Sequence, residues 1–365
     1  MNIVFLANHF NTGGITTYIL TLAQGLLKNG DKVWVISSGG DCEGLLRCMG
    51  VTHVRMDIKI KSEGHPKFWL ALPRLIRFLK DNKINIMHSQ TRVTAVMASI
   101  ASWMTKVPYV TTCHGFFKPR LFRLMFPCWG RTVIAISTPV KEHLECGFHV
   151  DPKRIMLIPN GIDSTQFAPV KAKQREALRE EKKISGDPVI GIIARLSSVK
   201  GIDVLIAAMP IVLKQFPNAC LWVVGQGDQE AYLKECARKR DLGEHVKFLP
   251  AVKQTSVLLP LFDIFVMPSL QEGLGLSVME AQASGVPVVA SKVGGLIDLI
   301  EDGKTGFLVK PKQHQDLAIK IIALLRDPVH AQSMAEAARE NIRINFSASR
   351  MFMGTYHCYE KNTRR

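Results

Sequence analysis

Short apolar runs alternate with amphipathic segments along almost the whole chain. The apolar runs predict strands at 3–7, 32–37, 84–88, 108–112, 132–137 and 154–159, and then at 188–194, 219–225, 245–249, 263–268, 286–291 and 306–309. The segments between them predict helices near 14–29, 67–80, 92–105 and 138–146, and then near 201–215, 228–240, 276–284, 295–301 and 315–326. Because the strands are almost continuously apolar, helices should cover both faces of a parallel sheet.

A change of composition divides this alternation into two series. Residues 169–187 contain a charged helical segment followed by Ser-Gly-Asp-Pro, which is typical of a turn. We therefore predict an amino-terminal domain at 1–168, a linker at 169–187 and a second domain at 188–345, with 346–365 packing back on the first domain. A chain of 365 residues suits two domains of ordinary size. The predicted fold class is α/β, with two facing doubly wound, Rossmann-like domains and a ligand cleft at the carboxyl ends of their strands.

The net charge of +16 is concentrated in the first domain. From residue 67 to residue 131, eleven Lys or Arg residues stand against the single acid Asp81. Residues 68–79 and 116–129 also carry Trp, Phe and Leu, a mixture that suits an anionic membrane surface. The alternative is a pair of ordinary amphipathic helices whose apolar sides face the core. Nucleic acid is not expected as a partner, because no recognisable binding module accompanies the charge.

The amino-terminal residues and the cysteine pattern indicate the cellular compartment of the protein. Residues 3–7 form an apolar run too short for a signal peptide, and no run approaches the roughly eighteen residues that span a bilayer. We expect a cytoplasmic protein, with peripheral association at the inner face of the membrane as a further expectation. The eight cysteines include no C-x-x-C pair, so we expect reduced cysteines that fill the core and no zinc site.

The segment 272–287 carries the strongest chemical signal. Gly273 and Gly275 permit a tight turn between a buried strand and a helix that begins near Leu276. The amides of Gly275, Leu276 and Ser277 would then be free to bind an anion. Glu272 precedes the helix and Glu280 follows one turn after its start, so two carboxylates would flank the anion. The structural alternative is a glycine turn followed by a solvated helix.

Other residues follow predicted strands and should lie at the same edges. Gly14 begins a helix after the first strand, and His114 follows another strand, where it could hydrogen-bond a substrate hydroxyl. Arg195 and Lys200 flank a helix start, and their joint charge suits a diphosphate. Gly225 ends a further strand, in half of a dinucleotide-binding pattern. Taken singly, Gly14 is equally compatible with a tight turn, and an isolated His114 is more often a structural side chain.

The ordered set of motifs resembles family 4 of the retaining glycosyltransferases with the GT-B fold. The resemblance covers nearly the whole chain, and the residues that carry it are Gly13-Gly14, His114-Gly115, 159–163, Arg195-Leu196, Lys200-Gly201, 224–227, 272–276, Glu280-Ala281, 285–289, Gly294-Gly295 and 305–309. Gln282 departs from the commoner small or apolar residue. The acceptor half shows few family residues beyond those named.

The resemblance implies transfer of a hexosyl group from a UDP- or GDP-sugar to an acceptor hydroxyl, with retention of anomeric configuration. It implies that Arg195 and Lys200 neutralise the diphosphate, that Glu280 binds the ribose and that Glu272 binds the transferred sugar. His114 would hold the sugar 6-hydroxyl or shape the acceptor side. A glycan or a lipid-linked molecule would be the acceptor. No Asp-x-Asp motif occurs, so we expect neither a metal nor any cofactor besides the nucleotide-sugar co-substrate.

Other functions fit parts of the same pattern. A sugar-nucleotide epimerase or a phosphorylase on the same fold remains an alternative, since a fold does not fix a function. A catalytically silent sugar-nucleotide-binding protein is a third. A nicotinamide dehydrogenase is disfavoured because the first strand is followed only by Gly13-Gly14 and not by a G-x-G-x-x-G turn.

Overall fold

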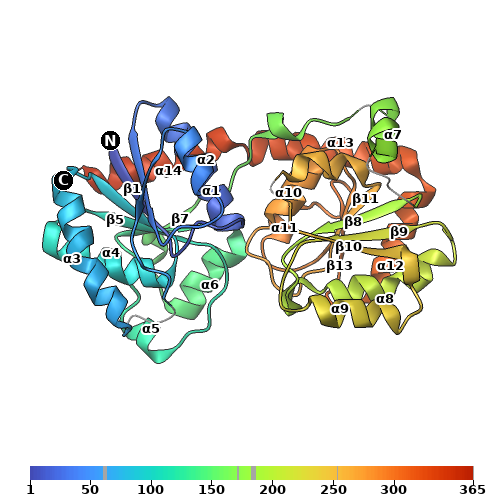
Figure 1. Ribbon diagram of the computed structural model, residues 1–365, viewed down its shortest axis with the longest axis horizontal. Coiled ribbons are helices and arrows are strands. Elements are labelled where there is room, and N and C mark those ends of the chain that lie inside the picture. Colours follow the sequence, from blue (N-terminus) through green and yellow to red (C-terminus); the bar gives the residue numbers. More distant parts are fainter. Residues whose placement is uncertain (61–63, 171, 182–185, 253, 365) are drawn as a thin grey trace. The chain divides into compact units, whose positions relative to one another are not determined.

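The chain divides into two compact units in a computed structural model (Figure 1). Unit 1 comprises Met1–Gly161 and Ala348–Arg365, and unit 2 comprises Ile162–Ser347. The structure describes residues 1–60, 64–170, 172–181, 186–252 and 254–364. Residues 171 and 182–185 of the predicted linker therefore lie outside the described residues.

A parallel sheet forms the centre of unit 1. Within the described residues its order is β3-β2-β1-β4-β5-β6-β7, and each neighbouring pair is parallel. The strands are β1 (Asn2–Leu6), β2 (Lys32–Ser37), β3 (Thr52–Arg55), β4 (Ile86–Ser89), β5 (Tyr109–Cys113), β6 (Thr132–Ala135) and β7 (Ile155–Leu157). The helices are α1 (Gly14–Lys28), α2 (Glu43–Cys48), α3 (Pro66–Asp81), α4 (Arg92–Thr105), α5 (Leu121–Met125), α6 (Thr138–Phe148) and α14 (Ala348–Thr363).

The first strand shows why this sheet is buried on both faces. Ile3 and Phe5 pack in a cluster with α1 and α14, whereas Val4 and Leu6 pack in a second cluster with α3 and α4. Successive side chains of a strand point to opposite faces, so an all-apolar strand supplies both clusters at once. The final helix, α14, is thereby part of the core of unit 1.

Unit 2 repeats the arrangement with a second parallel sheet. In the described part of this unit the order is β10-β9-β8-β11-β12-β13. The strands are β8 (Val189–Ile193), β9 (Cys220–Val224), β10 (Val246–Leu249), β11 (Ile264–Met267), β12 (Val288–Ser291) and β13 (Phe307–Val309). The helices are α7 (Ala172–Glu181), α8 (Ile202–Leu213), α9 (Glu230–Arg238), α10 (Leu276–Ala283), α11 (Leu296–Leu299), α12 (His314–Arg326) and α13 (Pro328–Asn345).

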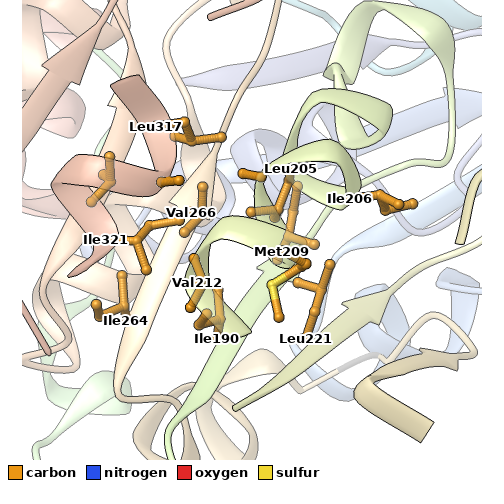
Figure 2. Close-up of a cluster of buried hydrophobic side chains, with 14 of the residues drawn as sticks. Ile190, Leu205, Ile206, Met209, Val212, Leu221, Ile264, Val266, Leu317 and Ile321 are labelled. Carbon is orange, nitrogen blue, oxygen red and sulfur yellow. The ribbon is translucent and has the colours of Figure 1, made fainter. Parts of the chain in front are cut away.

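Buried aliphatic side chains join the unit 2 sheet to its helices (Figure 2). Ile190 and Val266 from the sheet lie against Leu205 and Met209 of α8 and Ile321 of α12, all at most 1% exposed. Each such side chain contributes about 1.5–3 kcal/mol on burial. This core holds the strands whose carboxyl ends carry the predicted site residues.

The structure confirms the α/β, doubly wound architecture within each unit and adds elements that the pattern did not predict. The strand β3, the short helices α2 and α5, and the long helices α13 and α14 are among these additions. The charged helix of the predicted linker packs on unit 2, where Arg175 and Arg179 each bind a carboxylate oxygen of Asp263 at 2.7 Å.

The expectation that all cysteines fill the core is wrong for Cys48 and Cys146, which are exposed.

Each sheet has a point where the direction of strand order reverses. In unit 1 it lies between the neighbouring strands β1 and β4, and in unit 2 between β8 and β11. The loops that follow two such strands run to opposite sides of the sheet and leave a crevice that commonly binds ligands. The β8 loop and the β11 loop contain Lys200 and Glu272, respectively.

The two basic, apolar segments of unit 1 have different environments. On α3, Phe68, Leu72 and Leu75 are buried in the core, as the amphipathic-helix alternative predicts. None of the α5 side chains is buried, and Leu121 is 74% exposed while Met125 is 63% exposed. Among the described residues, no helix is both long and apolar enough to cross a membrane.

Candidate functional site

Backbone hydrogen bonds tie the loop after β8 to the loop after β9. The N–H of Leu196 donates to the carbonyl of Gln226 at 3.0 Å, and the N–H of Gln229 donates back to the carbonyl of Leu196 at 3.0 Å. A Cβ on Gly225 would lie 1.9 Å from the carbonyl oxygen of Ala194, and φ at Gly225 is +151°. Only glycine permits this approach, which explains its place at the end of β9.

The loop after β8 is also tied to the loop after β11. The N–H of Leu270 donates to the carbonyl of Val199 at 2.8 Å. A Cβ on Gly201 would lie 2.2 Å from the carbonyl oxygen of Pro268, so these two backbones are in direct contact. The two loops at the strand-order reversal therefore form one rigid edge.

An ion pair joins these two loops through predicted site residues. Lys200 Nζ lies 2.6 Å from Oε2 of Glu272, and the Ser269 hydroxyl donates to the same oxygen at 3.2 Å. The side chains of Lys200 and Glu272 are 18% and 13% exposed, so solvent screens their charges only in part. Within the described residues, Oε1 of Glu272 has no side-chain donor and remains available to a hydroxyl.

The α10 helix begins at this edge, as the sequence predicts. Gly275 caps it with φ +107°, a conformation that favours glycine, and a Cβ there would lie 2.7 Å from Leu296 Cδ2, which would have to shift. The N–H of Met279 makes a helical bond to the Gly275 carbonyl at 3.0 Å. The preceding amides of Leu276 and Ser277 have no carbonyl one turn earlier and point out of the helix start. Together with the turn at Gly273, they form a site suited to an anion.

Glu280 is partly buried on α10, one turn after the helix start. Burial raises the pKa of its carboxyl group to about 7, and a hydrogen bond from the Thr255 hydroxyl, 2.9 Å from Oε2, opposes part of this rise. A carboxyl group poised in this range can be protonated or ionised near neutral pH. It can therefore accept hydrogen bonds from neighbouring hydroxyls in its ionised form.

Arg195 lies two residues beyond β8, on the same loop as Lys200. Its side chain is exposed, and within the described residues it makes neither a hydrogen bond nor an ion pair. Its backbone carbonyl accepts from the N–H of Ser197 at 2.9 Å, which fixes the start of the loop. The guanidinium is thus available to an external anion, although the structure shows no direct contact between Arg195 and Lys200.

His114 and Gly14 lie in unit 1 at the carboxyl ends of its strands. Gly14 is the first residue of α1. His114 follows β5, and its Nε2 lies 2.7 Å from Oε1 of Gln90. The ring of Tyr18 packs edge-on against it, with centroids 5.0 Å apart. Burial lowers the pKa of His114 to about 3, so the imidazole is neutral at physiological pH.

Three polar residues at these sites were not predicted. Ser269 binds Glu272, Thr255 binds Glu280 and Gln90 binds His114. Each of the three follows the carboxyl end of a strand, at β11, β10 and β4. A search for polar residues just after each predicted strand would have found Ser269 and Gln90, whereas Thr255 lies six residues beyond the end of β10 and would have been missed.

Two family models match the chain in succession. The model described as Glycosyltransferase Family 4 matches residues 12–166. The model described as Glycosyl transferases group 1 matches residues 173–341. The first match lies in unit 1 except for residues 162–166, and the second lies in unit 2.

Relatives and solved structures agree with these matches. An uncharacterized glycosyltransferase of Methanocaldococcus jannaschii is 26% identical over 95% of this chain and 94% of its own. A GDP-mannose-dependent monoacylated alpha-(1-6)-phosphatidylinositol monomannoside mannosyltransferase of Corynebacterium glutamicum is 34% identical over 52% of each chain. The crystal structure of Anabaena Alr3699/HepE in complex with UDP-glucose matches with a TM-score of 0.88 and 22% identity, covering 99% of this chain and 100% of that one.

Proposed function

Since the chain belongs to the family 4 glycosyltransferases of the GT-B fold, we propose that it moves a hexosyl group from a nucleotide-diphosphate sugar to an acceptor hydroxyl with retention of configuration. The donor carries UDP or GDP. The observation that carries this proposal is the contact of Lys200 with Glu272 at the strand-order reversal of unit 2. It supports the proposal because a cation for a diphosphate and a carboxylate for sugar hydroxyls stand side by side.

Each residue of this edge has a distinct role in the proposed reaction. Lys200 has three N–H donors, of which one serves Glu272, so it can also bind a phosphate oxygen. Arg195 adds a planar fork for a second phosphate oxygen. As the glycosidic bond breaks, the diphosphate gains negative charge, and these cations with the amides of Leu276 and Ser277 stabilise it. We assign no metal ion to the leaving group.

The remaining roles concern the two ends of the donor. Glu272 binds hydroxyls of the transferred sugar, and the carboxylate of Glu280 accepts hydrogen bonds from the ribose. Gly14 brings backbone against the phosphates, and Gly225 keeps the β9 loop close to the β8 loop. His114 binds the 6-hydroxyl of the sugar. These assignments rest on the family resemblance together with the contacts described above.

The acceptor is proposed to be a glycan or a lipid-linked molecule in surface polysaccharide, lipopolysaccharide or glycolipid synthesis. The matched mannosyltransferase of Corynebacterium glutamicum bears the name of a phosphatidylinositol mannoside enzyme. In this chain, α5 exposes Leu121, Phe122 and Met125 among Lys118 and Arg120. Such a surface suits peripheral binding to an anionic membrane at its cytoplasmic face.

Incubation with a panel of labelled UDP- and GDP-sugars, with and without simple glycan and lipid acceptors, tests the proposed activity. We expect release of the nucleoside diphosphate and an α-linked product from an α-linked donor. Interconversion of the donor without release would favour the epimerase, and formation of a sugar 1-phosphate from a glycan and added inorganic phosphate would favour the phosphorylase. Tight binding without any turnover would favour the silent sugar-nucleotide-binding protein.

A further inference from the structure

Gln90 occupies the strand-order reversal of unit 1, directly after β4. Its backbone N–H donates to the carbonyl of Leu6, on the neighbouring strand β1, at 3.1 Å. Only 2% of the residue is exposed. A buried amide held in this way has few orientations, so the atom it presents to His114 is determined by its surroundings.

The surroundings fix which end of the amide faces His114. Gln90 Nε2 lies 3.5 Å from the backbone carbonyl oxygen of His88, and Gln90 Oε1 lies 2.7 Å from His114 Nε2. A carbonyl oxygen can only accept a hydrogen bond, so the amide nitrogen must be the atom beside it. The reversed amide would instead place an oxygen 3.5 Å from that carbonyl oxygen with no hydrogen between them, so this contact favours the orientation with Oε1 toward His114.

The orientation of the Gln90 amide determines which ring nitrogen of His114 carries the proton. Because the imidazole is neutral, it carries one proton, on either Nδ1 or Nε2. Gln90 Oε1 is an acceptor and requires an N–H partner, which places the proton on Nε2. The edge-on ring of Tyr18 holds the plane of the imidazole. Nδ1 is then left with a lone pair.

We propose that Gln90 is a positioning residue that keeps the His114 proton on Nε2, so that Nδ1 presents a hydrogen-bond acceptor to the substrate. The inference rests on the proposed function for the assignment of His114 to the 6-hydroxyl of the sugar. A hydroxyl can donate to this lone pair, whereas a carboxylate at the same carbon would be repelled by it. The site therefore selects hexosyl donors over uronosyl donors.

The tautomer can be measured directly, without any substrate. We suggest two-bond ¹H–¹⁵N spectra of protein labelled with ¹⁵N-histidine at neutral pH, with H114Q used to identify the signals of His114. We expect a protonated Nε2 and an unprotonated Nδ1. A protonated Nδ1 would overturn the proposal. This result does not depend on whether the protein turns over a nucleotide sugar, so failure of the proposed function is distinguishable from failure of the inference.

Substitution of Gln90 tests its part in the arrangement. Q90L lacks the acceptor. In this variant we expect the ¹⁵N chemical shifts of the two ring nitrogens of His114 to move toward each other, because the second tautomer becomes populated. The matched control is Q332L, at an exposed glutamine of α13. Unchanged His114 shifts in Q90L would overturn the role of Gln90.

Once a donor that supports turnover is identified, the same variants can be compared by their kcat/KM. Loss of one neutral hydrogen bond should lower kcat/KM for a hexosyl donor by about tenfold in Q90L. Binding of the free nucleoside diphosphate should be unchanged, since it lacks the sugar. Q90L with the kcat/KM of the natural protein would contradict the proposal.

Discussion

Lys200 Nζ lies 2.6 Å from Oε2 of Glu272, although the two residues are 72 positions apart in the chain. The contact arises because β8 and β11 are neighbours in the sheet and the loops that follow them touch. A nucleotide sugar presents its diphosphate next to its hexose. A cation in contact with a carboxylate matches that order of groups along the donor.

Replacement of Lys200 by Ala should lower the turnover of a nucleotide sugar by about 10²–10³-fold, because one preorganised charge on the leaving group is lost. The measurement is the steady-state release of nucleoside diphosphate. K234A is the matched control, since Lys234 makes a similarly short contact with Glu230, 2.7 Å, on the exposed surface of the same unit. Equal rates in K200A and K234A would refute the diphosphate role.

Substitutions of Arg195 test the planar shape of its guanidinium group separately from its charge. R195A should reduce turnover by orders of magnitude, whereas R195K should recover part of it, because lysine keeps the charge and loses the planar fork. R238A, at an exposed arginine paired with Glu235, provides a control for the loss of a surface guanidinium. Thermal unfolding midpoints should be unchanged in R195A, since the side chain is exposed. Full activity in R195A would contradict this role.

Glu280 should make donor binding depend on pH near neutrality. Its pKa is raised to about 7, so below that value the carboxyl group is protonated and loses acceptor capacity for the ribose hydroxyls. Donor affinity should therefore rise as the pH increases through about 7, and binding should release a proton. Calorimetry in buffers of different ionisation enthalpy measures that release.

Two variants check that Glu280 is the group responsible. E280Q should abolish the pH dependence. T255V removes the hydroxyl that opposes the rise in the pKa of Glu280, so the midpoint should move to higher pH. A pH dependence that is the same in the natural protein and in E280Q would assign it to another group.

Metal chelators should leave the activity intact. We propose that Lys200 and Arg195 neutralise the leaving group in place of a divalent cation. The measurement is the rate of nucleoside diphosphate release with and without excess EDTA. Loss of activity that is restored by magnesium would show that an ion takes part.

The α5 segment should direct the protein to anionic membranes. We expect co-sedimentation with phosphatidylglycerol-containing vesicles and little with phosphatidylcholine alone, and weaker binding after F122S with K118E and R120E. V329S is a control, because Val329 is 81% exposed on α13 in unit 2. Binding that is indifferent to lipid charge would indicate that α5 serves another purpose.

The core strands of both sheets were predictable because burial on both faces requires an unbroken apolar run. Ile3–Leu6 illustrates this, since its residues supply two opposite clusters. In contrast, β3 (Thr52–Arg55) lies at a sheet edge with half-exposed side chains and no such run. The α14 helix buries Thr355 and Asn362 beside Met351, and this mixture of polar and apolar residues weakens its periodic signal.

Candidate site residues could be named one by one from the sequence, but the contacts between them could not. Glycines such as Gly275 mark the helix start, and the strand before it marks the edge. The pairing of Lys200 with Glu272 depends on which strands are neighbours, and local sequence does not determine that order. The same holds for Gln90 and His114, which meet because β4 pairs with β5.

A crystal structure with a bound nucleotide sugar tests the central claim most directly. We expect the diphosphate to lie within hydrogen-bond distance of Lys200 Nζ, the Arg195 guanidinium and the amides of Leu276 and Ser277, with the ribose at Glu280 and the hexose at Glu272. A donor bound with its diphosphate away from Lys200 and from the start of α10 would contradict the account.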